Sequence, residues 1–581
     1  MHRALFNKFS ACLFLCVAVL SAPLHAEEIL GYLPENALSF ALVRDVQTTN
    51  DKIVKFVEIF NEELPAPLAM AQAMTGLSDG LDLNGDVLFA LLPTSEPTAV
   101  PAPMFLLPVN DYAALAASIQ ADATGEICRV NIAEEDVLIA RHGAYALVMN
   151  PEHREIMQSL LGAADHFPEE IERYKDWIAA NDVSMMVTSA GIKHLSAAAK
   201  KELKAAESPT EAGDFDEQAM ANDMLNVGDV LPFSEFIEKE IKVAGMGLAL
   251  DETINARLRW TVELQKAEVT VDAAPQPVAE GKPLLGYTDQ SYALAGGGPL
   301  PLELVAQLPE LCIQISRDMA GMDGRGDYTE KDWAEVRESY ESAFAGLRGL
   351  SVLLVPVAEK EPLLSIIFAR LQVVDSSKYL ESLQKTADLA NRLSERSKGD
   401  IKLHYDISPI TVAESKGFEI TCDLDKATGD GDNHIWQTLL TAFLGIDHKL
   451  SVYCCAVDQT HVAVGIESKS TLSKFIESYR KGDTSLAANA QVQKTLKLFS
   501  FEPRWLTLIN PQGFVDIVQS AVKSLMILGY APKIPVYPTA PPLGMALEHK
   551  ENSWQGELAM PVGAARAMAE FARKVEKSLD Q

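Results

Sequence analysis

The chain contains the same succession of segments twice, and this repetition constrains its fold more than any other feature. The matched segments, in chain order, are GYLPENALSFALV (31–43) with GYTDQSYALAGG (286–297), FLLPVNDYAALAASI (105–119) with IIFARLQVVDSSKYLESL (366–383), VLIARHGAYALVMNPEHREIMQSLL (137–161) with LSVYCCAVDQTHVAVGIESKSTLSKFI (450–476), VSMMVTSAGIKHL (183–195) with RWLTLINPQGFVDIV (504–518), and GLALDE (247–252) with GMALEH (544–549). A shared rhythm of secondary structure explains any single match, but their common order favours an internal duplication. We therefore predict two tandem related halves.

The repeated segments predict an α+β fold. Apolar and polar residues alternate in short runs, as expected for strands, and several runs form hairpins. Asn110 and Asp375 each follow an apolar strand and can cap the helix after it. Within 51–64, Ile53, Val54 and Val57, together with Phe60 and Leu64, are spaced for one helix face. Each half is expected to hold an antiparallel sheet with amphipathic helices packed on one side.

The domain boundaries follow from the same comparison. We predict a signal peptide at 1–26, a first α+β half at 27–268, a Pro- and Ala-rich linker at 269–283 and a second half at 284–581. The charged helical stretch at 328–347 has no clear match in the first half. It is interpreted as an insertion.

The N-terminus indicates export. Arg3 and Lys8 precede an apolar run that ends near Leu24, and Ala26 is a suitable cleavage point. The run is shorter than a membrane anchor and is interrupted by Pro23. Neither Cys12 nor Cys16 has the surroundings of a lipoprotein signal. The mature chain is therefore expected in the periplasm or outside the cell, without a transmembrane segment.

The charge is strongly acidic and unevenly distributed. The net charge is −31; residues 27–280 carry 43 acidic and 17 basic side chains, against 38 and 31 in residues 281–581. An acidic field repels phosphate backbones, so we predict no binding to nucleic acid. The acidic excess of the first half has two interpretations. We favour a solvated acidic surface, and the alternative is a docking face for a cationic partner.

The cysteines do not predict a disulfide framework. The mature chain has Cys128, Cys312, Cys422, Cys454 and Cys455, an odd number at irregular spacing. Buried thiols are the favoured interpretation. A single bridge from Cys422 to one of the adjacent pair is the alternative, and that pair should point to opposite faces of a strand.

Motifs for metal, nucleotide or nucleophilic chemistry are lacking or incomplete. The histidines are scattered (His142, His194, His434, His448 and His461). The acidic runs at 78–87, with Asp82, Asn84 and Asp86, and at 423–434 lack the spacing of a calcium loop and are interpreted as turns. Ser-x-x-Lys occurs at Ser382–Lys385 and Ser520–Lys523 without its companion motifs. An Arg-Gly-Asp triplet at 325–327 is interpreted as a chance match. We predict no cofactor and no metal, and catalytic residues cannot be named.

The stretch LPENALSFALVRDV (33–46), with the later strand–Asp/Asn–helix units, resembles the opening of large secreted bacterial families of unknown function. The resemblance implies an envelope or periplasmic protein and supplies no active-site residues.

Three functions are therefore compared. We favour an exported, non-catalytic protein that binds a partner or ligand, either a protein or a small molecule. The alternatives are an exported hydrolase of polysaccharide or peptide that uses a carboxylate pair, and an envelope carrier of apolar ligands. The carrier would need a sheet face lined with Leu, Val and Met that its own helices leave uncovered.

Overall fold

The computed structural model describes residues 29–61, 64–94, 100–121, 125–133, 135–162, 168–206, 238–265, 284–300, 302–322, 328–356, 362–396, 404–424, 444, 448–525, 534–550 and 552–579. The chain divides into two compact units: Met1–Val271 with Glu548–Val562, and Asp272–Leu547 with Gly563–Gln581. The predicted signal peptide and the whole of the predicted linker lie outside the described residues.

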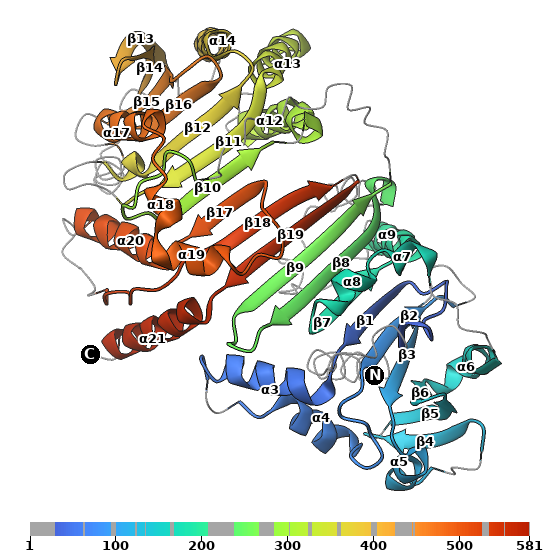
Figure 1. Cartoon of the computed structure of the whole chain (residues 1–581). Coiled ribbons are helices and arrows are strands. Elements are labelled where there is room, and N and C mark those ends of the chain that lie inside the picture. Colours follow the sequence, from blue (N-terminus) through green and yellow to red (C-terminus); the bar gives the residue numbers. More distant parts are fainter. Residues whose placement is uncertain are drawn as a thin grey trace. The chain divides into compact units, whose positions relative to one another are not determined.

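The first unit is built on an antiparallel sheet with β1 near its middle (Figure 1). The strand order is β4-β5-β6-β3-β2-β1-β7-β8-β9-β19. The strands are β1 (Ser39–Val43), β2 (Val87–Leu92), β3 (Ala102–Pro108), β4 (Cys128–Ile132), β5 (Glu135–His142), β6 (Tyr145–Met149), β7 (Val183–Val187), β8 (Ile241–Leu250), β9 (Ala256–Leu264) and β19 (Ser553–Met560). Strand β19 therefore completes a sheet whose other strands come from the N-terminal half of the chain.

Helices cover both faces of this sheet at β1–β6. One core cluster joins Phe40, Leu88 and Leu106 to Met157 and Trp177, from α6 (Arg154–Gly162) and α8 (Lys175–Ala179). Strand residues of opposite parity form the second cluster with α3 (Val46–Val57), α4 (Pro67–Thr75) and α5 (Tyr112–Ser118). The remaining helices are α7 (Glu169–Glu172) and α9 (Ser189–Ala206). The expectation that helices pack on one side only is therefore wrong for this region.

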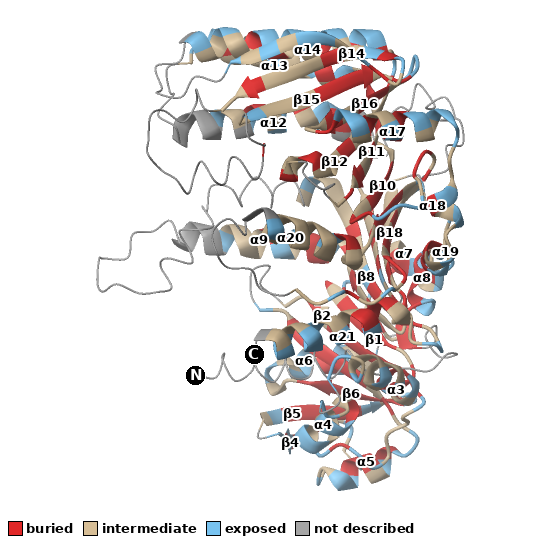
Figure 2. Ribbon diagram, turned by 90° about the vertical axis from the view of Figure 1, so that its left-hand side faces the viewer, coloured by how far each residue is buried: buried red, intermediate tan, exposed pale blue. Residues whose placement is uncertain are grey.

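The second unit has its own antiparallel sheet, in the order β13-β14-β15-β16-β12-β11-β10-β17-β18. The strands are β10 (Leu294–Pro299), β11 (Leu347–Leu354), β12 (Ile367–Val373), β13 (Tyr405–Val412), β14 (Ser415–Asp423), β15 (Lys449–Ala456), β16 (His461–Ile466), β17 (Trp505–Ile509) and β18 (Leu543–Lys550). The helices are α12 (Leu302–Met322), α13 (Glu330–Ala345), α14 (Ser376–Arg396), α17 (Lys469–Arg480), α18 (Ser485–Ala488), α19 (Ala490–Leu496), α20 (Pro511–Leu525) and α21 (Val562–Leu579). Figure 2 shows the buried residues concentrated in the strands, with exposed residues along the helices.

The two units use the same order of elements. In each, the first strand lies between the second strand and a later strand, β7 or β17. Two helices separate the first and second strands: α3 and α4 in one unit, α12 and α13 in the other. The stretch 328–347, interpreted above as an insertion, contains α13. It thus occupies a place that α3 and α4 occupy in the first unit.

The fold is mixed α+β with extensive antiparallel pairing, as predicted. Among the described residues, no helix combines the length and the apolar character that a membrane span requires. Two helices differ in detail from their predictions, and in α5 the N-cap is Asp111 rather than Asn110. Helix α3 ends at Val57, and its buried residues are Val46, Thr49 and Asn50, so the predicted apolar stripe is only partly covered.

Candidate functional site

The strands β7, β8, β9 and β19 have two faces of opposite character, and one of them is the candidate site. Side chains alternate along each strand, and the pairing register aligns residues of the same face across all four strands. Ser184, Gly247, Arg259 and Glu557 share one face. Their neighbours Met185, Met246 and Trp260 share the other. The first set is buried and the second is not.

The buried face carries charges. Arg259 Nε donates to Glu557 Oε1 at 2.8 Å, and the two side chains are only 8% and 1% exposed. Arg259 also donates to the Asn181 side chain, and its guanidinium lies 5.6 Å from the centre of the Trp177 ring. Burial lowers the pKa of Arg259, and the Glu557 carboxylate opposes this shift. The ion pair therefore links β9 to β19 inside the first unit.

A second buried carboxylate lies further along β9. Glu263 is 4% exposed. It accepts hydrogen bonds at 3.1 Å from Tyr174 Oη and from Lys242 Nζ, and forms an ion pair with Arg173. Buried charges of this kind require partners, because an unpaired charge in the interior costs several kcal/mol. The segment from α7 to Asn181 supplies Arg173 and Tyr174, and β8 supplies Lys242.

The opposite face is apolar and only partly covered. We call it the open face, and it consists of Val183, Met185, Val187, Ala244, Met246, Leu248, Leu258, Trp260, Val262, Trp554 and Leu558. Each of these residues is at least partly exposed, and Met246 and Leu258 are 47% and 39% exposed. A row of adjacent apolar side chains in water is unfavourable, and such patches mark interaction surfaces.

Two tryptophans, Trp260 and Trp554, are the largest side chains of the open face. Trp260 and Gly556 are paired across β9 and β19, and a Cβ built on Gly556 would lie 2.0 Å from Trp260 Cε2. The indole therefore lies directly over the Gly556 backbone. Trp554 lies two residues before Gly556 in β19 and is on the same side of the strand. Helices cover part of the open face: α9 contacts β7 and β8, with its start at Gly191 against the Val187 side chain, and α3 also contacts β8.

The histidines do not converge. His461 Nδ1 lies 3.0 Å from both carboxylate oxygens of Asp458 and 3.3 Å from Tyr479 Oη. Burial acts to raise the pKa of Asp458, but hydrogen bonds from Thr460 and His461 bring it below its usual value. His142 stacks edge-on against Tyr32 in the other unit. His194 is on α9, His448 precedes β15, and His434 lies outside the described residues. No three His, Cys, Asp or Glu residues converge as metal ligands in the described part of the chain.

The acidic run at 78–87 forms a turn. Asp82 accepts a hydrogen bond from the Asn84 backbone, while Asp86 is fully buried and accepts from the Asp45 backbone. Asp45 and Asp86 are neighbouring buried carboxyl groups, but a substrate cannot reach a side chain with 0% exposure. Most of the run at 423–434 and the Arg-Gly-Asp triplet lie outside the described residues.

Among the described residues no disulfide forms: all five cysteines from Cys128 to Cys455 are free. The alternative bridge from Cys422 is therefore wrong. Cys422 is opposite Leu450, whereas Cys454 is opposite Phe418, so the register places the thiols apart along the strands. Burial raises the pKa of Cys454 to about 12 and of Cys455 to about 11, so both remain thiols. Both are buried although they point to opposite faces of β15.

The Ser-x-x-Lys pairs serve their own helices. Ser382 donates to the Tyr379 carbonyl and Lys385 pairs with Glu381, while Ser520 donates to the Asp516 carbonyl.

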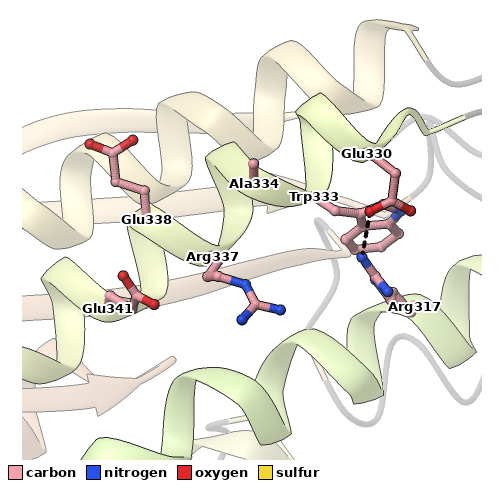
Figure 3. Close-up of a pocket in the computed structure, with 7 residues that line it drawn as sticks. All are labelled: Arg317, Glu330, Trp333, Ala334, Arg337, Glu338 and Glu341. Atoms are coloured by element: carbon pink, nitrogen blue, oxygen red, sulfur yellow. Dashed lines mark hydrogen bonds and ion pairs between the residues drawn. The ribbon is translucent and has the colours of Figure 1, made fainter.

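A hollow of about 200 Å³ lies between α12 and α13. Figure 3 shows that it is lined by alternating charges, with Arg317 bonded to Glu330 beside Trp333. A second hollow of about 350 Å³ near Tyr112 and Arg141 is also polar. Neither assembles a nucleophile with a base.

No protein family, curated protein or solved structure matches this chain. The open face is the feature that sequence reasoning missed. Its signal was present in ARLRWTVEL, where alternation separates Leu258, Trp260 and Val262 from Arg259, Thr261 and Glu263. Apolar side chains are normally expected on the buried side of a strand, but here Arg259, Thr261 and Glu263 are the buried residues.

Proposed function

We propose that this is an exported, non-catalytic binding protein of the cell envelope that takes up an apolar ligand, such as an aliphatic chain, on its open face. The observation that carries the proposal is the partly exposed apolar face of β7, β8, β9 and β19. Covering one Leu, Val or Met side chain on binding contributes up to about 1.5–3 kcal/mol. A few such contacts are enough for micromolar affinity.

The chemistry of the face favours an apolar ligand over a polar one. Its side chains offer no charge and, apart from the two indole N–H groups, no hydrogen-bond donor. An anionic head group would also meet the acidic charge of residues 27–280. A neutral or cationic amphiphile therefore fits better than a fatty-acid anion. Export from residues 1–26 would place the protein where such molecules occur.

The shared strand order supports a further part of the proposal, that the two units derive from one duplicated plan. Strands β1–β8 have counterparts of equal order in the second unit, which adds β13 at the sheet edge. The equivalent of β9 is β19, and it pairs with β9 in the first unit. The open face would then combine equivalent strands from both copies.

The test is a titration with the neutral fluorophore N-phenyl-1-naphthylamine. The full chain should show saturable enhancement of probe fluorescence. Met246→Glu and Leu258→Lys place charges where the side chains are already exposed, so the fold should tolerate them. Each should weaken probe binding about tenfold or more. The matched control is Leu311→Lys, on α12, where the side chain is 55% exposed but outside the open face. Equal binding by all three variants would contradict the proposal.

A further inference from the structure

A buried carboxyl group joins the end of β1 to the start of α3. Asp86 is 0% exposed and immediately precedes β2. Its Oδ1 accepts a hydrogen bond of 3.1 Å from the Asp45 backbone N–H. Its Oδ2 is buried and has no hydrogen-bond partner. A buried carboxylate oxygen without a donor is costly when the group is charged.

The turn that carries Asp86 also holds the N-terminus of α3. The Val46 and Gln47 N–H groups donate to the carbonyls of Gly85 and Leu83, at 3.3 and 2.9 Å. Asp45 caps the helix with a hydrogen bond to the Thr48 N–H, and its φ of 48° is in the left-handed region. A non-glycine residue there is held by its surroundings. The turn and the first turn of α3 therefore form one interlocked junction.

The charged groups around Asp86 oppose one another. Burial is the largest influence and raises the pKa of Asp86 to about 7; the Arg44 guanidinium lowers it and the Asp45 carboxylate raises it. Arg44 Nε is itself buried without a hydrogen-bond partner. The Arg44 backbone N–H donates to the Asp182 carbonyl, and the Asp182 carboxylate pairs with Lys52 of α3 at 2.7 Å.

We propose that this junction is a proton-operated latch, which holds the first turn of α3 tightly while Asp86 carries a proton and releases it more readily once that proton is lost. The sign follows from linkage. In an opened or unfolded chain Asp86 ionises near its ordinary pKa of 3.8. Between about pH 4 and 7 the closed form holds a proton that the open form has lost, so each rise in pH favours opening. Above about pH 7 both forms are ionised and the effect levels off.

The test is hydrogen exchange read by mass spectrometry on the full chain between pH 5 and 8, corrected for the intrinsic exchange rate. One proton is linked to opening, so protection of residues 46–57 should fall by up to about tenfold per pH unit between pH 5 and 7. Asp86→Asn removes the titrating group and should flatten this dependence. Asp111→Asn, which changes the exposed cap of α5, should leave it unchanged.

A second variant keeps the proposal testable if Asp86→Asn does not fold. Arg44→Gln removes the cation that favours ionised Asp86. The pH at which protection levels off should therefore move upward. Protection of α3 that does not vary with pH in the parent chain, or an unchanged pH dependence in Arg44→Gln and Asp86→Asn, would overturn the latch.

Discussion

The two faces of strands β7, β8, β9 and β19 differ in a way opposite to the usual distribution. The covered face holds Arg259, Glu263 and Glu557, and the partly exposed face holds the open-face residues, including Met246 and Trp260. Charged groups are normally outside and apolar groups inside. The charged groups of the covered face join β9 to β19 and to the segment from α7 to Asn181. This inverted distribution is also the observation on which the proposed binding of an apolar ligand rests.

The largest effect is expected at the buried ion pair. Arg259→Met leaves the Glu557 carboxylate buried without its partner, which should reduce the free energy of unfolding by about 3–5 kcal/mol. The double variant Arg259→Met/Glu557→Met removes both charges and should recover most of that loss. Denaturant unfolding measures both. The exposed pair Lys385–Glu381 is the control, and Lys385→Met should change stability by less than about 0.5 kcal/mol. If Arg259→Met is as stable as the parent chain, the Arg259–Glu557 pair does not hold β9 and β19 together.

A smaller effect is expected at Gly556, where the Trp260 indole of the open face lies over the β19 backbone. Gly556→Val inserts a side chain into the space that the Trp260 indole occupies, and should destabilise the chain by about 1–3 kcal/mol. The displaced indole should also change the tryptophan emission spectrum. Gly162→Ala, on α6, is the control, because a Cβ there meets nothing within 4 Å. Unchanged emission in Gly556→Val would mean that Trp260 does not lie over β19.

The smallest stability effect is expected on the open face. Met246→Glu exchanges a side chain that is already 47% exposed, so the free energy of unfolding should change by no more than about 1 kcal/mol. Its effect on probe binding should be much larger than its effect on stability. This separation sharpens the comparison, because a core residue would lose stability first. A loss above about 3 kcal/mol would identify Met246 as part of the core.

The sequence predicted the elements better than their surroundings. The alternating runs identified β7, β8 and β9 as strands. Alternation gives the two sides of a strand, but it does not say which side other elements cover. For Arg259 and Trp260, the covered side is set by α8 and by β19. The β19 partner of Arg259, Glu557, is 298 residues further along the chain. Likewise, Cys454 and Cys455 are both buried because helices and neighbouring strands cover both faces of β15.

The site was harder to predict for the same reason. Asp86 was recognised as part of a turn, but its burial arises from the pairing of that turn with α3, which no local pattern reveals. The carrier hypothesis named Leu, Val and Met as the lining it would need. The open face has that lining together with Trp260 and Trp554, which were not singled out.

The most direct test of the open face is photo-crosslinking with a neutral aliphatic diazirine probe, followed by mass spectrometry of the labelled peptides. The account predicts saturable labelling in peptides of β7, β8, β9 and β19, and its loss in Met246→Glu and Leu258→Lys. Labelling concentrated instead at the other exposed apolar residues of the first unit, Phe60, Met70 and Met74 on or beside α3 and α4, would contradict it.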